Sequence, residues 1–308
     1  MTDSTTTLVT IFGGSGFLGR EVLRVLGERG HRIRVAVRHP RRMYHRRSMG
    51  AEIDAVKANV CSPRSVVAAV RGADVVINLV GILVESDGQQ FEAVHAEGAG
   101  IVAAAARETG ARLIHISAIG VHEKSSAPYA RSKAHGEAAV RVALPEATIL
   151  RPSIMFGPHD DFINRFAAMS RILPVLPLIG GGEARFQPVY VGDVANAIGK
   201  AVAGETRPGT TYELGGPDVM TVRELVEFVL ATVDRERFLV PVPVAIARLQ
   251  ASFLQHFPGT PLTPDQVDLL TRNSVVSKAA AREGRTLAGL GIEPASMEAI
   301  VPTYLRDR

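Results

Sequence analysis

The stretch TLVTIFGGSGFLG, residues 7–19, decides the fold. Its first six residues are short, apolar or β-branched, as expected of a strand that is buried on both faces of a sheet. Glycines then stand at every third position, as Gly13, Gly16 and Gly19. Apolar residues recur at every fourth position after the turn, which predicts an amphipathic helix that ends near Gly30. The chain therefore begins with a strand, a glycine-rich turn and a helix.

This glycine spacing meets the physical needs of a turn that holds the diphosphate of a dinucleotide. One glycine makes the tight turn, the next lets the backbone approach the pyrophosphate, and the last lets the helix pack closely on the sheet. The pyrophosphate would lie at the N-terminus of the helix that begins near Phe17, where free N–H groups and the helix dipole favour an anion. An ordinary glycine-rich turn between a strand and a helix is the alternative interpretation.

Strand-like and helix-like segments continue to alternate as far as residue 154, and this predicts a parallel sheet with helices on both faces. We therefore expect an α/β fold of the Rossmann type, a doubly wound parallel sheet, with a smaller and mostly helical C-terminal lobe. Further strands are expected at 33–37, 51–57, 75–80, 113–117 and 148–150.

The alternation breaks after residue 154, where prolines and glycines become frequent. The segment 186–216 resembles a return to the sheet, with strands at 187–191 and 211–214 around a helix that begins at Asp193, which we expect to be its N-cap. Thr221 and Glu224 form a capping box that opens another helix.

Two domains follow from this pattern. The nucleotide-binding domain is expected to comprise residues 1–154 together with 186–216. Residues 155–185 and 217–308 are expected to form the smaller lobe, which would bind the substrate or a partner over the carboxyl edge of the sheet.

Composition excludes several classes of protein. The net charge of +4 over 308 residues is too small to indicate nucleic-acid binding. A single cysteine, Cys61, excludes an intrachain disulfide and a zinc site built on cysteines. No apolar run reaches the length of a membrane span, and residues 1–7 lack the order of a cleavable targeting signal. We therefore expect a cytoplasmic protein that holds no metal.

Arg38 stands at the end of the second expected strand, where a carboxylate would accept from the 2′-hydroxyl of NAD(H). An arginine at this place accommodates the 2′-phosphate of NADP(H), and no acidic residue lies between Glu28 and Glu52. The pattern therefore favours NADP(H) over NAD(H). Alternatively, the arginines of 32–47 form only a solvated basic face, which could also contact an acidic partner or an anionic membrane.

Tyr129 and Lys133 form a Y-x-x-x-K pattern, which places the phenol and the ammonium group on one face of a helix. The cation is expected to lower the pKa of the tyrosine, which makes the phenol usable as a general acid or base. Ser117 ends the preceding strand, so its hydroxyl can reach the same carbonyl or alcohol oxygen. Together with the glycine turn, these residues point to hydride chemistry on a bound dinucleotide.

The sequence resembles the short-chain dehydrogenase/reductase superfamily, in its atypical and extended branch. The resemblance covers nearly the whole chain and is most evident in 113–120, 129–137, 150–166, 186–195 and 212–221. Within that superfamily it is most similar to the group that contains the nucleotide-binding accessory subunit of respiratory complex I, and a neighbouring member takes part in ubiquinone biosynthesis.

The resemblance implies roles for particular residues. Ser117, Tyr129 and Lys133 match the catalytic triad, and Lys133 would also hold the nicotinamide ribose. The expected contacts with NADP(H) are made by Gly13, Ser15, Gly16, Phe17, Leu18, Gly19, Arg38, Asn59, Val60, Val80, Gly81, Lys133, Pro152 and Ile154. Asn59 stands where many relatives carry an aspartate near the adenine, and His95 stands where many carry an asparagine, which we interpret as a packing residue.

Two other features have more than one interpretation. His159, Asp160 and Asp161 could ligate a metal, but an N-cap with acids at a helix N-terminus explains them better. The segment 242–257 carries Ile246, Leu249, Phe253 and Phe257 at helical spacing. Such a stripe is usually core, and an interfacial helix against a membrane or a quinone-bearing partner is the alternative.

Three functions remain open from the sequence. The first is an NADP(H)-dependent oxidoreductase acting on a carbonyl or alcohol, including a quinone. In the complex I subunit the nucleotide is structural, so the second is a non-catalytic NADPH-bound assembly or stability subunit of a respiratory or quinone-biosynthesis complex, attached peripherally to the inner face of a membrane. The third, a nucleotide-sugar epimerase or reductase, rests on fold analogy.

Overall fold

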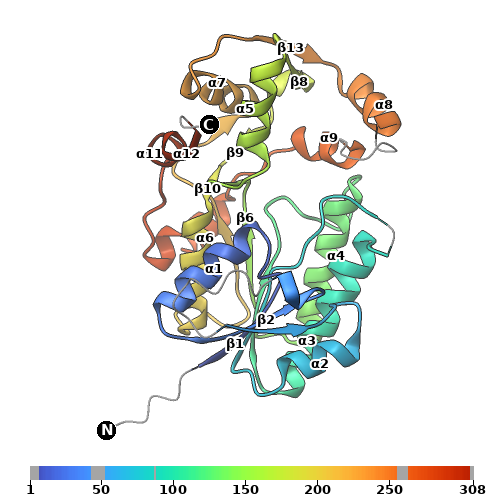
Figure 1. The fold of residues 1–308 in the computed structure, drawn as a ribbon, viewed down its shortest axis with the longest axis vertical. Coiled ribbons are helices and arrows are strands. Elements are labelled where there is room, and N and C mark those ends of the chain that lie inside the picture. Colours follow the sequence, from blue (N-terminus) through green and yellow to red (C-terminus); the bar gives the residue numbers. More distant parts are fainter. Residues whose placement is uncertain (1–6, 43–52, 87, 255–262, 306–308) are drawn as a thin grey trace.

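A computed structural model describes residues 7–42, 53–86, 88–254 and 263–305. Its central element is a sheet of seven parallel strands in the order β11-β6-β5-β4-β1-β2-β3 (Figure 1). Each strand in this sheet is parallel to its neighbours, so all carboxyl ends meet at one edge, and the expected doubly wound Rossmann sheet is confirmed. The strands are β1 (Leu8–Phe12), β2 (Arg32–Val37), β3 (Ile53–Lys57), β4 (Val75–Asn78), β5 (Arg112–Ile116), β6 (Thr148–Pro152) and β11 (Thr211–Leu214).

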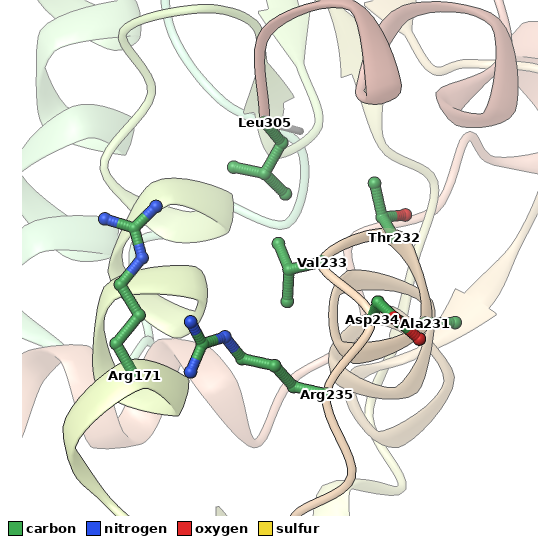
Figure 2. A pocket seen from close by; sticks show the side chains of 7 residues that line it. All are labelled: Arg171, Ala231, Thr232, Val233, Asp234, Arg235 and Leu305. Carbon is green, nitrogen blue, oxygen red and sulfur yellow. The ribbon is translucent and has the colours of Figure 1, made fainter. Parts of the chain in front are cut away.

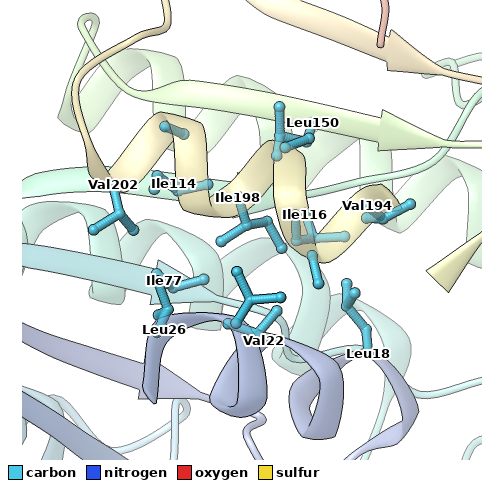
Figure 3. Packing of buried hydrophobic residues seen from close by; sticks show 14 of the residues in the cluster. Leu18, Val22, Leu26, Ile77, Ile114, Ile116, Leu150, Val194, Ile198 and Val202 are labelled. Atoms are coloured by element: carbon cyan, nitrogen blue, oxygen red, sulfur yellow. The ribbon is translucent and has the colours of Figure 1, made fainter. Parts of the chain in front are cut away.

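Helices cover both faces of this sheet. On one face, α1 (Phe17–Glu28) packs beside α6 (Val191–Val202), and Figure 3 shows Leu18, Val22 and Leu26 of α1 facing Val194, Ile198 and Val202 of α6. On the other face lie α2 (Pro63–Val70), α3 (Gly98–Glu108) and α4 (Pro128–Ala143), with a π-helical turn, η3 (Glu92–Glu97), before α3. Because both faces are covered, the strands are mostly apolar on both sides, as in β4, where all four residues are buried and only Asn78 is polar.

The smaller lobe stands over the carboxyl edge of the sheet (Figure 1). Its core is formed by α5 (Phe162–Ile172), α7 (Val222–Thr232), α11 (Met297–Ile300) and α12 (Pro302–Leu305). A parallel ribbon of β8 (Val175–Ile179) and β13 (Phe238–Val242) lies at its far end, next to α8 (Val244–Leu254) and α9 (Pro264–Leu270). The remaining elements are η1 (Pro40–Arg42), β7 (Met155–Phe156), η4 (Gly180–Gly182), β9 (Arg185–Phe186), β10 (Val189–Tyr190), β12 (Met220–Thr221), α10 (Lys278–Arg282) and η5 (Ala288–Leu290).

The expected return of 186–216 to the sheet is only half correct. β11 joins the sheet beside β6, whereas β10 pairs with β7 in a separate two-stranded sheet. The prediction that Asp193 is the N-cap of α6 is wrong, because Tyr190 holds that position. Asp193 instead accepts a hydrogen bond from the backbone N–H of Ala295 at 2.8 Å, which ties α6 to the C-terminal segment. The capping box of Thr221 and Glu224 is confirmed at the start of α7.

The apolar stripe of α8 is not core. Its small residues Ala247 and Ala251 are buried, whereas Ile246 is 49%, Leu249 74% and Phe253 68% exposed. The core interpretation of this stripe is therefore wrong for these three residues; Phe257 lies outside the described part of the chain. Across the described segments, no helix combines the length and the hydropathy that a membrane span requires.

Candidate active site

The glycine turn between β1 and α1 is shaped by close backbone contacts. Gly13 has φ +83°, and a Cβ on it would lie 3.0–3.2 Å from the backbone of Leu79 and Val80. A Cβ on Gly19 would lie 2.6 Å from the carbonyl oxygen of Gly13. Glycine is thus required at both positions, first so that the turn can pass beside the end of β4 and then so that α1 can pack on the turn.

The N-terminus of α1 is suited to an anion. Its N-cap is Gly16, which has no side chain to accept from the first N–H groups, and the first turn contains no acidic residue. Among the described residues, no side chain caps these N–H groups, so they and the positive end of the helix dipole are available to bind a ligand. Together with the cradle at Gly13, where a Cβ would collide, this arrangement fits the diphosphate of a dinucleotide.

Other residues expected around the nucleotide divide into two kinds. Val80 adjoins Gly13 and donates its N–H to the Oδ1 of Asn78 at 3.1 Å. This hydrogen bond helps to fix residues 79–82, here called the strip after β4. Leu18, by contrast, turns its side chain into the core, so only its backbone can face a ligand. At the carboxyl edge of the sheet, Pro152 ends β6 and the carbonyl of Ile154 accepts from Val189 at 2.9 Å.

The residues expected at the adenosine end lie on the tips of neighbouring strands. Arg38 is exposed directly after β2. Burial and the charge of Glu97 raise the pKa of Cys61, in the loop between β3 and α2, and the nearby charge of Arg38 partly opposes this rise. In that loop, Asn59 accepts from the N–H of Cys61 at 3.1 Å, so this side chain shapes a local turn. Val60 is buried under Gly98. Residues 43–52, which carry Arg46 and Arg47 of the expected basic face, lie outside the described residues.

Ser117 and Lys133 meet at the end of β5. The Nζ of Lys133 donates to the carbonyl oxygen of Ile116 at 2.6 Å, which holds the ammonium group beside the strand. Ser117 is 4% exposed, and its Oγ has no hydrogen-bond partner in the described part of the chain. Buried hydroxyl groups are normally paired, so an unpaired one at this edge fits an oxygen atom supplied by a bound molecule.

The pKa values of Tyr129 and Lys133 differ from the expectation. Burial raises the pKa of Tyr129 to about 12, and the charge of Asp265 adds to the shift, so the expected lowering by Lys133 is not observed. Burial lowers the pKa of Lys133 to about 8, partly opposed by the charge of Glu137. At neutral pH the phenol is therefore a proton donor and the lysine is still largely a cation.

Asp265 is a site residue that the sequence did not indicate. It lies in α9, and its Oδ2 accepts from the backbone N–H of Tyr129 at 3.3 Å. The N-cap of α4 is Ala127, which has no side-chain acceptor, so a carboxylate from the smaller lobe takes over this function. The capping box of Thr263 and Gln266 predicts a helix start but not this contact, because Asp265 and Tyr129 are 136 residues apart.

The expected acidic N-cap of α5 is confirmed, with Asp161 at the N-cap and the carboxylate of Asp160, one residue earlier, accepting from the first N–H groups of the helix. The carboxylate of Asp160 accepts from the N–H groups of Gly157 and Ile163 and from the hydroxyl of Tyr304, at 3.2, 2.5 and 3.1 Å. These partners account for a buried acid without a metal. In the segments that the structure describes, no group of three His, Cys, Asp or Glu residues is placed to hold a metal ion.

A cavity of about 470 Å³ lies in the smaller lobe, away from these residues (Figure 2). Arg171 faces it from the last turn of α5, where a cation complements the negative end of the helix dipole, and Arg235 faces it from the segment that follows α7. The cavity shares no residue with the site.

The sequence of this chain is similar to those of several known proteins. The model of the NAD dependent epimerase/dehydratase family matches residues 9–215. The chain is 36% identical over 293 residues to the NADH dehydrogenase [ubiquinone] 1 alpha subcomplex subunit 9 of Arabidopsis thaliana mitochondria, covering 89% of this chain and 72% of that protein. It is 37% identical over 191 residues to a ceramide reductase of Caulobacter vibrioides, covering 61% and 58%.

Two more distant similarities agree with these. A 2-alkyl-3-oxoalkanoate reductase of Stenotrophomonas maltophilia is 28% identical over 259 residues, covering 74% of this chain and 76% of that protein. The structure of a dTDP-glucose 4,6-dehydratase from Streptomyces venezuelae, solved with NAD and TYD, superposes with a TM-score of 0.75 at 20% identity, covering 97% of this chain and 96% of that one. The latter similarity concerns the fold.

Proposed function

The chain belongs to the NAD dependent epimerase/dehydratase family, and we propose that it is an NADPH-dependent reductase that converts a carbonyl group to an alcohol. The observation that carries this proposal is the arrangement at the end of β5. There, a buried serine hydroxyl without a partner lies beside a buried lysine, and the lysine shares its helix with a protonated tyrosine.

The residues of the chain divide the work as follows. Bound NADPH supplies the hydride for the carbonyl carbon. The Oγ of Ser117 donates a hydrogen bond to the carbonyl oxygen and orients it. Tyr129 transfers its phenolic proton to that oxygen as the charge develops, and Lys133 then stabilises the phenolate. A phenol that is protonated at neutral pH is in the form that reduction requires, because reduction of the carbonyl consumes a proton.

The preference for NADPH is supported by Arg38. It is exposed at the tip of β2, and the described residues around it place no carboxylate at that tip for a 2′-hydroxyl. A guanidinium can donate two hydrogen bonds to a phosphate, so it would favour the nucleotide that carries the additional phosphate.

Similarity to complex I subunits and to reductases indicates where the substrate is to be sought. We propose a quinone, or another ketone of respiratory or quinone metabolism. The test is to follow NADPH oxidation by the pure protein with a panel of quinones, ketones and 3-oxoalkanoates. Turnover that Tyr129→Phe abolishes is the expected result. Equal turnover by wild type and Tyr129→Phe contradicts the mechanism.

A second function is favoured by a different observation, the apolar surface of the smaller lobe together with the similarity to complex I subunits. In this alternative, the protein binds NADPH as a structural component and stabilises a respiratory or quinone-biosynthesis complex. It would be cytoplasmic and would attach peripherally to the inner face of the membrane. Deletion of the gene, followed by quantification of assembled complex I and of quinone, tests this: loss of either supports it, and unchanged levels exclude it.

A further inference from the structure

We infer that His95 is a positioning residue that joins the nucleotide-binding strip after β4 to the catalytic helix α4, an inference that rests on the proposed function. His95 is 1% exposed and lies in the π-helical turn η3. Such turns are rare and often occur at functional sites. The interpretation of His95 as a packing residue accounts for its burial but not for its two polar contacts.

Both ring nitrogens of His95 are used. The Nε2 accepts a hydrogen bond from the backbone N–H of Ile82 at 2.9 Å. In a neutral imidazole the proton is then on Nδ1, which lies 2.9 Å from the Oγ of Ser132 and donates to it. The hydroxyl of Ser132 in turn donates to the backbone carbonyl of Tyr129, also at 2.9 Å. One directed chain of hydrogen bonds thus runs from Ile82 to Tyr129.

The direction of this chain is stable because the ring stays neutral. Burial and the nearby charge of Lys133 lower the pKa of His95 to about 3. Lys133 and the buried His115 lie on the neighbouring elements, and neither offers a negative charge that would favour protonation. The tautomer is therefore fixed across the physiological range of pH.

Ring packing fixes the same geometry. The imidazole stacks on Phe91 at 5.5 Å between ring centres and meets the ring of Tyr129 edge to face at 5.4 Å. The backbone around it is also held, because a Cβ on Gly136 of α4 would lie 2.1 Å from the carbonyl oxygen of His95. His95 therefore contacts the tyrosine through its ring and through the chain of hydrogen bonds at once.

The consequence concerns both halves of the expected site. Val80 adjoins the glycine turn two residues before Ile82, and Tyr129 lies at the other end of the chain of hydrogen bonds. Loss of the acceptor on His95 removes the partner of the half-buried N–H of Ile82, which loosens the strip, while loss of the donor releases Tyr129. If His95 only filled space, its replacement by a residue of similar size would disturb neither the strip after β4 nor Tyr129 selectively.

The test compares His95→Phe, His95→Gln and Ser132→Ala with a matched control, Val94→Ala, a buried core residue beside His95 whose side chain is purely apolar. We expect His95→Phe to raise the Kd for NADPH about tenfold, because loss of the hydrogen bond that holds Ile82 disfavours the binding conformation. His95→Gln should recover most of this loss, since its amide can accept from Ile82. Ser132→Ala should lower the rate of hydride transfer and leave the Kd within about threefold.

Two results overturn the inference. One is an equal effect of Val94→Ala and His95→Phe on the Kd at matched loss of thermal stability. The other comes from 15N NMR of the imidazole, which reads the tautomer in the absence of nucleotide and substrate. We expect a neutral Nδ1–H ring from pH 5 to 8, and titration near the ordinary pKa of 6.5 contradicts the inference. If the wild type binds no NADPH, the proposed function fails, while the NMR result still judges the hydrogen-bond chain.

Discussion

The sheet half of the molecule and its smaller lobe treat apolar residues differently. In the sheet, Ile11, Ile77 and Ile149 are wholly buried between two layers of helices. In the ribbon of β8 and β13, one face is buried through Leu176 and Leu178, yet the other face exposes Phe238 by 78%. A strand that is apolar on both faces is normally covered on both. The apolar residues of the sheet half are therefore covered, whereas the lobe presents apolar side chains to the solvent.

The exposed apolar residues of β8 and β13 are grouped rather than scattered. Phe238 pairs with Val175, and Val240 lies two residues further along the same face. Leu249 of α8 is 74% exposed. Single exposed apolar residues, such as Val142 on α4 in the sheet half, need no explanation, but grouped ones mark surfaces that contact something.

The largest effect is expected at Tyr129, inside the sheet half. Tyr129→Phe removes the proton donor and should lower the rate of carbonyl reduction by about 10²–10⁴-fold. Nucleotide affinity and thermal stability should stay near wild type, because the ring contacts with Phe91 and His95 are kept. Single-turnover kinetics measure the rate of reduction, and calorimetry measures the nucleotide affinity and the thermal stability. A parallel loss of NADPH binding would show that the tyrosine serves only to build the site.

Gly19→Ala tests whether the glycine turn is as closely packed as the structure indicates. The added Cβ would lie 2.6 Å from the carbonyl of Gly13, and relieving this contact is expected to destabilise the protein by about 1–3 kcal/mol and to abolish measurable NADPH binding. Ser15→Ala, in the same turn but exposed, should change stability by less than about 0.5 kcal/mol. Urea unfolding measures the free energy of unfolding of both variants. Equal destabilisation by Gly19→Ala and Ser15→Ala would contradict the steric argument.

Lys133→Met isolates the energetic consequence of a buried cation. The pKa of Lys133 is lowered from 10.5 to about 8, so between these values the unfolded chain binds a proton that the folded protein does not. The free energy of unfolding should therefore rise with pH across this window, by about 3 kcal/mol in all. The variant should lose this rise and should be more stable than wild type at pH 7, while it loses activity. A wild-type stability that is flat from pH 8 to 10 contradicts the burial of this charge.

Arg38→Ser addresses the exposed end of the nucleotide site. Loss of the charged hydrogen bonds should weaken NADPH binding by about 10–100-fold and leave NADH binding unchanged. Arg41→Ser, also exposed and just beyond β2, is the control and should have a smaller effect. If both nucleotides are weakened equally, Arg38 contributes only a general positive field.

The smallest effect on stability is expected for the surface of the lobe. Leu249→Ser and Phe238→Ser should change the free energy of unfolding by less than about 0.5 kcal/mol, since both side chains are mostly exposed. They should nevertheless reduce co-sedimentation with membranes. Val142→Ser, on the sheet half, should not. Equal co-sedimentation of all three variants would contradict a specific role of the lobe surface in membrane attachment.

The sequence predicted those parts of the fold that depend on neighbouring residues. The strand, turn and helix of 8–28 follow from glycine spacing and apolar periodicity, both local properties. The pairing of β10 with β7 was not predicted, because a two-residue strand carries no periodic signal. Sequence could place Ser117, Tyr129 and Lys133 on consecutive elements, and their chemical roles stay predictions.

The remaining features depend on contacts between distant segments. Asp265 reaches Tyr129 across 136 residues, and nothing in either local pattern indicates the partner. The same holds for the pKa of Tyr129, which local spacing predicted to fall and which burial raises to about 12. Likewise, the exposure of Leu249 could not be read from its helical spacing, which is the same for a core stripe and a surface stripe.

The most direct test of the account is an isothermal titration of the nucleotide-free protein with NADPH and with NADH. The account predicts binding of both at one site per chain, with NADPH bound more tightly, and loss of both in Gly19→Ala. Absence of binding heat for either nucleotide, or binding that Gly19→Ala leaves intact, would contradict the claim that the turn after β1 holds a dinucleotide.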